Sequence, residues 1–208
     1  MVFTLMAVGA AGVVVVWRLV AAGRVTIWAG QAFLFAAAGS AALATGRVHL
    51  SPRVWWTWGL LVGSGTGVVL YVATLAFVAV VRRWPPFERH VDLIYDQRRG
   101  LSLTAALVLA AALIAPGEEL FWRGLFQGRL AGATGWAVAA LVTWAIYVVT
   151  NAASGSLPIL AAAVVSGAVW GALALWTHGV LASLACHSLW TSLMAAAPPT
   201  TPRERAEP

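Results

Sequence analysis

The 208-residue sequence predicts an all-α protein, a polytopic bundle of about seven transmembrane helices. Two properties of the composition support this fold class: 61% of the residues are hydrophobic, and only 10% are charged. In addition, the charged residues gather in short groups that separate apolar runs of about 20 residues, the length a helix needs to cross a bilayer. No part of the sequence indicates a second, water-soluble domain.

Arginines delimit three expected spans in the N-terminal half, at residues 1–17, 25–46 and 54–81. The first run lacks the basic start and the cleavage site of a signal peptide, so we expect a retained helix. The third span begins with tryptophans of the kind that gather at membrane interfaces, namely Trp55, Trp56 and Trp58.

The longest polar stretch, residues 82–100, contains five arginines and is the expected cytoplasmic loop. Pro85 and Pro86 end the preceding helix, because proline lacks the amide proton that a helix interior requires. Beyond them, five residues could form the apolar side of a short interfacial helix: Phe87, Val91, Leu93, Ile94 and Tyr95. A solvated connector and a substrate-gating segment both remain open for this stretch.

A fourth helix is expected over residues 101–130, interrupted by Pro116 and Gly117. Such a helix would be about 45 Å long, whereas the hydrocarbon core of a bilayer is about 30 Å thick. We therefore expect either a kink at Pro116-Gly117 or a tilted, partly interfacial second half.

No charged residue occurs between Arg129 and Arg203, which leaves room for three more helices. Their expected breaks are residues 151–158 and 177–179. The chain then divides into N-terminal helices with the loop (1–100), a core (101–197) and a disordered tail (198–208). With the N-terminus outside and the C-terminus inside, the Arg47/Arg53 loop lies outside, against the usual excess of arginine on the cytoplasmic side.

The formal charge of +6 comes from thirteen arginines, with no lysine. Because they lie in short loops between apolar runs, we expect them to contact the lipid bilayer, and we expect no nucleic-acid partner. The single cysteine, Cys186, excludes an intramolecular disulfide. The absence of lysine and the abundance of Ala, Val and Arg suggest an integral protein of a bacterial plasma membrane.

The most informative motif is Glu118-Glu119-Leu-Phe-Trp-Arg123. A charge at the centre of a bilayer costs about 2.5–3.5 kcal/mol, so charged residues there usually serve a function. On a helix, Glu119 and Arg123 have the spacing of an ion pair, while Glu118 is rotated by about 100° and is available as a general base. The alternative is a charge pair that anchors the helix, with Glu118 facing a polar cavity.

A second polar group lies on the last expected helix, where Ser183, His187 and Thr191 share one face. An intramembrane histidine can also simply hydrogen-bond a neighbouring helix, and this alternative stays open. Asn151, at the end of an earlier span, needs no function as a helix terminator.

Together these motifs resemble the CPBP family (CAAX protease and bacteriocin-processing, also called Abi) of intramembrane proteases. Glu118-Glu119-x-x-x-Arg123 matches its Glu-Glu-x-x-x-Arg signature, and Gly167-x-x-x-Gly171 followed by His187 is similar to its final two helices. The resemblance covers about residues 101–197 and implies a catalytic core of four helices there.

The resemblance implies a role for each motif residue. Glu118 is the base that activates water, Glu119 and Arg123 support it, and His187 is the histidine of the last helix. Two positions depart from the family pattern. Asn151 replaces histidine in the Phe-x-x-x-His motif, here Tyr147-Val-Val-Thr-Asn151, and Thr191 replaces an asparagine. An asparagine can donate a hydrogen bond to an oxyanion but cannot shuttle a proton.

The expected function is therefore that of an endopeptidase acting on a membrane-associated peptide or protein, without a cofactor. A catalytic metal is disfavoured because Glu118, Glu119 and His187 supply at most three ligands. The alternative is a catalytically impaired protein of the same fold, acting as a scaffold or immunity factor. A small transporter ranks last, since no inverted repeat is visible.

Overall fold

The computed structural model describes residues 1–97 and 100–199, and the regular structure there is entirely helical. Arg98, Arg99 and most of the predicted tail, residues 200–208, lie outside the described residues. The main elements are α1 (Val2–Ala21), α2 (Ile27–Ala44), α3 (Trp56–Val81), α4 (Pro85–Asp96), α5 (Leu103–Leu107), α6 (Ala115–Glu119), α7 (Gly128–Thr134), α8 (Trp136–Ala152), α9 (Leu157–Thr177) and α10 (Leu181–Ala196).

Five helices of the described chain are long and apolar enough to cross a membrane: α1, α2, α3, the continuous helix Leu103–Thr134, and α9. Two further apolar helices are shorter, with 17 residues in α8 and 16 in α10. The prediction of an all-α integral membrane protein is thus confirmed. The first helix continues to Ala21, past the predicted end at residue 17.

The long central helix runs for 32 residues from Leu103 to Thr134 and does not end at Pro116. On either side of α6 its backbone adopts wide π-helical turns, η1 (Val108–Ile114) and η2 (Leu120–Gln127). Such turns change the hydrogen-bond pattern of a helix and are frequent at functional sites. The expected irregularity around Pro116-Gly117 therefore takes the form of π-helical turns that flank the acidic motif.

Glycines allow the helices to approach closely, as expected for packing in lipid. A Cβ atom on Gly67 of α3 would lie 2.8 Å from the carbonyl oxygen of Cys186 on α10. One on Gly39 of α2 would lie 2.7 Å from the Cα atom of Gly117. Glycine at these positions thus brings α2 and α10 against the helices they pack on.

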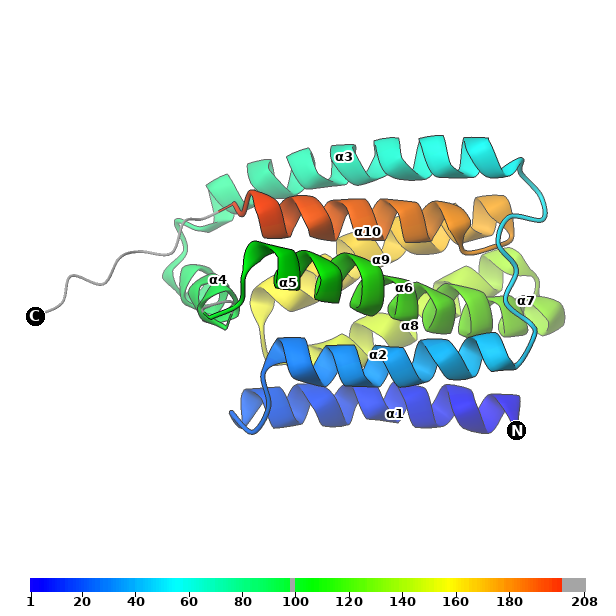
Figure 1. The fold of residues 1–208 in the computed structure, drawn as a ribbon, viewed down its shortest axis with the longest axis horizontal. Helices are drawn as coiled ribbons and strands as arrows, with labels where there is room; N and C mark the ends of the chain where they lie inside the picture. The colour runs from blue at the N-terminus through cyan, green and yellow to red at the C-terminus, as the bar shows by residue number, and fades with distance from the viewer. Residues whose placement is uncertain (98–99, 200–208) are drawn as a thin grey trace, which may run out of the picture.

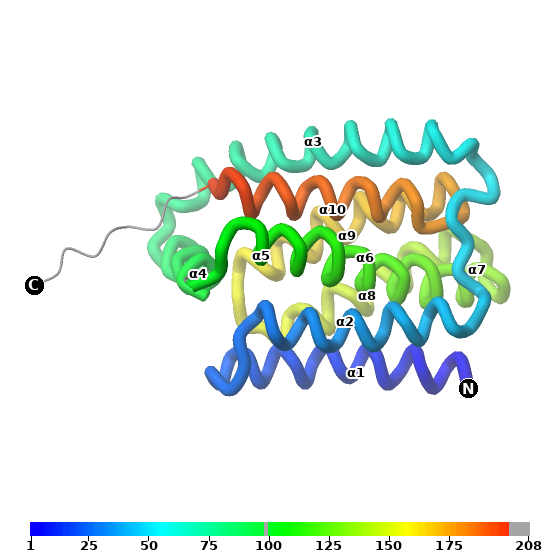
Figure 2. Tube along the Cα trace, viewed as in Figure 1, coloured from blue at the N-terminus to red at the C-terminus, as the bar shows by residue number. Residues whose placement is uncertain are grey.

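The bundle has two ends (Figure 1). The α4 end contains α4, the α1–α2 turn and the C-terminal end of α10. The α7 end contains α7, the α2–α3 connection and the α9–α10 turn. The tube view shows α3 beside α10, α1 beside α2, and the central helix between these pairs (Figure 2). The acidic motif therefore lies inside the bundle, midway between the two ends.

The predicted interfacial helix is present as α4, with Phe87 and Val91 each 3% exposed. Leu93, which the sequence placed on the same apolar side, is instead 61% exposed. Two polar side chains of this region accept hydrogen bonds from the first turns of other helices. His90 Nδ1 accepts from Leu157 N at 3.3 Å, and Gln97 Oε1 accepts from Ile27 N at 2.7 Å. These contacts satisfy amides that a helix start leaves unpaired.

At the α7 end, the connection before α3 pairs with the turn before α10. Val180 N donates to His49 O at 3.0 Å, and Leu181 N donates to Leu50 O at 2.9 Å. Gly179 fits here because a Cβ atom would overlap the Leu50 carbonyl. This pairing fixes the start of α10, the helix that carries His187.

Candidate active site

The four charged or titratable residues of the predicted site are all buried. Glu118 and Glu119 lie at the midpoint of the central helix, with exposed fractions of 8% and 0%, and Arg123 follows one turn later with 1%. His187 of α10 is 5% exposed. Such a group persists in an apolar bundle only when its members compensate one another.

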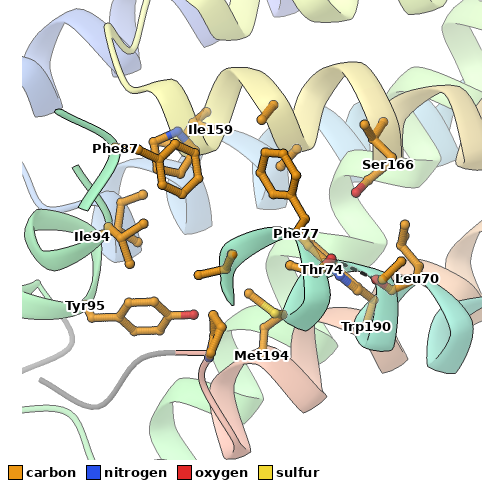
Figure 3. Close-up of a pocket in the computed structure, with 18 residues that line it drawn as sticks. Leu70, Thr74, Phe77, Phe87, Ile94, Tyr95, Ile159, Ser166, Trp190 and Met194 are labelled. Atoms are coloured by element: carbon orange, nitrogen blue, oxygen red, sulfur yellow. Dashed lines mark hydrogen bonds between the residues drawn. The ribbon is translucent and has the colours of Figure 1, made fainter. Parts of the chain in front are cut away.

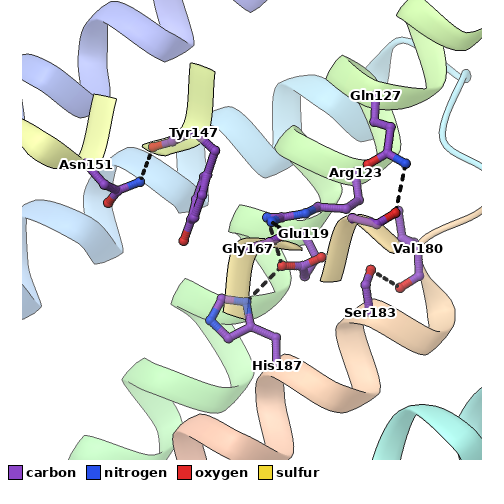
Figure 4. A network of polar contacts seen from close by, with 10 residues as sticks. Glu119, Arg123, Gln127, Tyr147, Asn151, Gly167, Val180, Ser183 and His187 are labelled. Carbon is purple, nitrogen blue, oxygen red and sulfur yellow. Dashed lines mark hydrogen bonds and ion pairs between the residues drawn. The ribbon is translucent and has the colours of Figure 1, made fainter. Parts of the chain in front are cut away.

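Glu119 is the centre of the polar network (Figure 4). Its Oε1 atom lies 3.2 Å from Arg123 Nη1 and 2.9 Å from His187 Nδ1. The ion pair predicted from the i, i+4 spacing is therefore present. Because an ionised carboxylate only accepts hydrogen bonds, His187 donates through Nδ1–H, so in the neutral ring the lone pair is on Nε2.

Arg123 is compensated on several sides. Besides the ion pair, Nη2 donates to the carbonyl oxygen of Gly167 at 3.1 Å. The guanidinium carbon lies 4.7 Å from the ring centroid of Tyr147 and 5.3 Å from that of Trp170. Cation–π contacts of this kind are strongest when the charge is removed from water.

His187 is held by an aromatic neighbour as well as by Glu119. Its ring stacks on Trp170 of α9, with a centroid distance of 3.6 Å and an interplanar angle of 16°. A carboxylate on one ring nitrogen and a stacked ring on one face fix both the tautomer and the orientation of a histidine. The side chain is thus prepared to present Nε2 in one direction.

Glu118 has different surroundings from Glu119, as the helical rotation predicted. It takes no part in the ion pair, and the hydroxyl of Tyr147 lies beside its carboxyl group. Arg123 is close enough to Glu118 for its charge to act on that carboxyl group. The two adjacent acids therefore differ in their partners: Glu119 is bound to Arg123 and His187, and Glu118 is not.

The Gly167-x-x-x-Gly171 motif of α9 shapes this site. A Cβ atom on Gly167 would lie 2.8 Å from Cδ1 of Tyr147, so glycine lets that ring pack against α9. The carbonyl of Gly171 accepts from Gln127 Nε2 at 3.1 Å. Gln127 was not singled out from the sequence, although its i+4 spacing from Arg123 on the same helix face was a usable signal.

Asn151 is buried, with 6% exposure, and both its polar atoms have partners. Its Oδ1 accepts from Trp17 Nε1 of α1, and its Nδ2 donates to the carbonyl of Tyr147, both at 2.9 Å. In Figure 4, Tyr147 lies between Asn151 and the Glu119–His187 pair. The residue of this motif that reaches Glu118 is Tyr147, which sequence reasoning did not assign; its signal was a phenol where the family has phenylalanine.

The other members of the predicted polar stripe on α10 are Ser183 and Thr191. Ser183 is fully buried, donates to the Val180 carbonyl at 3.0 Å and faces Glu119. The Thr191 hydroxyl is buried without a hydrogen-bond partner among the described residues. Within the same part of the chain, no group of three His, Cys, Asp or Glu side chains is placed to hold a metal ion.

These side chains define a class of protein: a helical membrane protein with glutamate, arginine and histidine buried together at the middle of the bundle. Residues 100–193 match the family described as Type II CAAX prenyl endopeptidase Rce1-like, and this part of the chain is a domain of that family. The matched residues run from just before α5 to within α10 and include the whole polar network. The resemblance drawn from the motifs is thereby confirmed. Neither the curated proteins nor the solved structures give a significant match.

Proposed function

We propose that the protein is an intramembrane endopeptidase that cleaves a peptide bond in a membrane-associated peptide or protein. The observation that carries this proposal is the unequal pair of buried acids. Glu119 is bound to Arg123 and His187, whereas Glu118 is buried beside them but outside the ion pair, and we assign to it the attacking water molecule. Two neighbouring carboxylates, of which one orients a histidine and the other accepts a proton, are suited to hydrolysis.

In the proposed reaction, Glu118 takes a proton from water as the water oxygen attacks the peptide carbonyl carbon. The same proton then passes to the amine that leaves as the carbon–nitrogen bond breaks. His187, held by Glu119, accepts a hydrogen bond from the attacking water through Nε2. Arg123 keeps Glu119 ionised and therefore acts through it.

We propose Tyr147 as the donor that stabilises the oxyanion. Its hydroxyl lies beside Glu118, whereas both polar atoms of Asn151 bind elsewhere. Asn151 then acts by positioning α8 against α1, and Thr191 offers a spare hydroxyl one turn beyond His187. Removal of one oxyanion donor typically lowers kcat by about 10²–10³, so Tyr147→Phe should lower the cleavage rate by that factor.

An apolar groove of about 410 Å³ supports a substrate with a membrane-embedded part (Figure 3). It lies between α3, α4, α9 and α10, where Phe77, Phe87 and Met194 line it. Trp190 and the buried Ser166 also line it. Trp190 packs edge-on against Trp170, which stacks on His187, so an apolar group in this groove would lie close to the site.

The proposal includes the membrane topology. We propose that α8 and α10 also cross the membrane, which gives seven spans in a bacterial plasma membrane, with a catalytic core in residues 101–197. Support comes from their apolar composition and from the return of the chain to alternating ends of the bundle (Figure 1).

The test is cleavage of a pool of membrane-tethered peptides by the reconstituted protein, read by mass spectrometry. Glu118→Gln should reduce the rate by about 10²–10⁴, the usual contribution of a general base, with an unchanged melting temperature. Asp92→Asn, the matched loss of a carboxylate on α4, should cleave like the wild type. Equal cleavage by Glu118→Gln and the wild type would refute the assignment.

A second candidate, a catalytically impaired scaffold or immunity factor, is favoured by one observation: asparagine stands where the family has a histidine. Asn151→His separates the two. If wild type cleaves nothing and Asn151→His does, the natural protein is the impaired form. If wild type cleaves and Tyr147→Phe is slow, the phenol has replaced the missing histidine as donor.

A further inference from the structure

In addition to the apolar groove, a polar cavity lies at the α7 end, and Glu118 is not among the residues that line it. It has a volume of about 210 Å³, which is ample for a tetrahedral oxyanion. Its lining is cationic and hydrogen-bonding, with Arg47, His49, Arg129, His178 and Trp136 contributing, and Arg123 also reaches it. The proposed hydrolysis uses none of the first five of these residues.

The cavity is open because glycines form one wall. Gly124, Gly128 and Gly132 are spaced by four residues, so they lie on one face of the helix. A Cβ atom on Gly128 would find nothing closer than the Arg123 carbonyl at 3.8 Å, and one on Gly132 nothing closer than Arg129 Nη1 at 3.8 Å. These two glycines therefore leave room instead of mediating helix packing.

Apart from Arg123, which is paired with Glu119, the arginines at this end have no counter-charge among the described residues. Among residues 1–97 and 100–199, the acids are Glu88, Asp92 and Asp96 of α4, at the opposite end, and the buried pair Glu118 and Glu119. Arg47, Arg53 and Arg129 form no ion pair with any of these described carboxylates. Three arginines gathered without an acid attract an anion from outside the chain.

His178 adds a hydrogen-bond donor of fixed geometry. Arg53 Nη1 lies 3.2 Å from His178 Nε2, and because arginine can only donate, Nε2 accepts and the proton is on Nδ1. The ring stacks on Trp136 at a centroid distance of 4.4 Å and an angle of 7°. Its backbone is left-handed, with φ of 55°, an uncommon state for a residue other than glycine.

We propose that this cavity binds a phosphate group, supplied either by a lipid headgroup or by free phosphate. Guanidinium groups match phosphate geometry and form strong charge-assisted hydrogen bonds with it. The depth of the cavity in the membrane fits a lipid headgroup as the source. Trp55, Trp56 and Trp58 at the same end of the bundle are 54–69% exposed, as expected at a membrane interface. The proposal also gives a purpose to the Arg47/Arg53 loop, which the positive-inside rule does not explain.

The experiment measures lipid retention by native mass spectrometry of the full chain in detergent. The probes are phosphatidylglycerol and a galactolipid with the same acyl chains but no phosphate. Wild type should retain phosphatidylglycerol and lose the galactolipid. The double variant Arg47→Gln/Arg129→Gln should retain about tenfold less phosphatidylglycerol, because charged hydrogen bonds are lost. The matched double variant Arg18→Gln/Arg24→Gln, at the other end, should behave like wild type.

Gly128→Leu provides an independent variant, since it fills the cavity without removing a charge and should also lower retention about tenfold. Inorganic phosphate then distinguishes the sources. If inorganic phosphate displaces the lipid, or raises the melting temperature of the wild type but not of the cavity variants, the site takes free phosphate. If it does neither, the site requires the lipid. The proposal is overturned if the cavity variants, folded by circular dichroism, retain phosphatidylglycerol as wild type does, or if wild type retains the galactolipid equally.

Discussion

The two clusters of this protein that contain arginines differ in how the positive charge is compensated. At the middle of the bundle, Arg123 is almost fully buried and is bound by a carboxylate, a carbonyl and two aromatic rings. At the α7 end, Arg47 is exposed, Arg129 is partly exposed, and neither has a described acid as partner. The environment of an arginine, and not the residue type, therefore determines whether its charge must be neutralised within the chain.

The physical reason is the cost of removing a charge from water. Burial of an ion carries a penalty of several kcal/mol, which only a well-placed partner offsets. A charge at the surface is solvated and screened, so an unpaired arginine there costs little and remains available to a ligand. The predictions below test this contrast, beginning with the largest expected effect.

Glu119→Gln should destabilise the protein most, by about 3–5 kcal/mol, because it leaves Arg123 buried without a counter-charge. The free energy of unfolding is measured by denaturant titration in mixed micelles. Asp92→Asn, the same chemical change on α4, is the control and should cost less than about 1 kcal/mol. A double variant Glu119→Gln/Arg123→Gln should recover part of the loss, since the unpaired charge is gone. A small effect of Glu119→Gln alone would contradict the compensation described here.

Substitution of glycines should separate the packed region from the open one. Gly117→Ala should cost about 1–3 kcal/mol, because the new Cβ atom would overlap the Phe35 carbonyl of α2. Gly128→Ala should be neutral or stabilising by up to about 1 kcal/mol, since its Cβ atom enters open space in a helix. Melting temperatures of the two alanine variants, measured side by side, check this; equal destabilisation would mean that the cavity wall is packed.

Arg47→Gln should change the free energy of unfolding by less than about 0.5 kcal/mol, as is usual for surface positions without a buried partner. Arg123→Gln, in contrast, leaves the buried carboxylate of Glu119 without its arginine partner and should lower the free energy of unfolding by several kcal/mol. The two are compared in the same denaturant titration. A large cost for Arg47→Gln would show that its charge already has a partner within the protein.

The smallest expected effect is a pH dependence at the α7 end. Partial burial, and secondarily the charge of Arg53, lowers the pKa of His178 from its ordinary value of 6.5. The folded state therefore disfavours protonation of His178. The contribution of the neutral ring to the free energy of unfolding is complete above pH 6.5 and is lost as the pH falls below that value. Between pH 8 and 5, the melting temperature should fall less in His178→Gln than in wild type. Both proteins keep the other cationic and titratable residues of the cavity, Arg47, His49 and Arg129. Parallel curves would exclude this contribution.

Much of the site could be predicted from local spacing. The i, i+4 relation of Glu119 and Arg123 indicated their ion pair, and the one-residue offset of Glu118 indicated a different environment. Local spacing could not reveal that His187 binds Glu119, because these residues are 68 positions apart. The partner of Asn151 was equally out of reach, since Trp17 belongs to the first helix. The first two helices contribute this contact and the close approach at Gly39, although no motif marked them.

Local sequence is enough to predict a helical membrane protein with a buried acidic site, because hydrophobic length and the cost of charge in lipid are properties of the local chain. The position of Tyr147, and not Asn151, beside Glu118 becomes visible in the folded chain alone, as does the cavity that arginines from separate segments enclose. These outcomes depend on how helices distant in sequence pack together. Glycines such as Gly167 allow that packing, because another helix occupies the space that a side chain would fill. The neighbour that occupies this space is not evident from the local sequence.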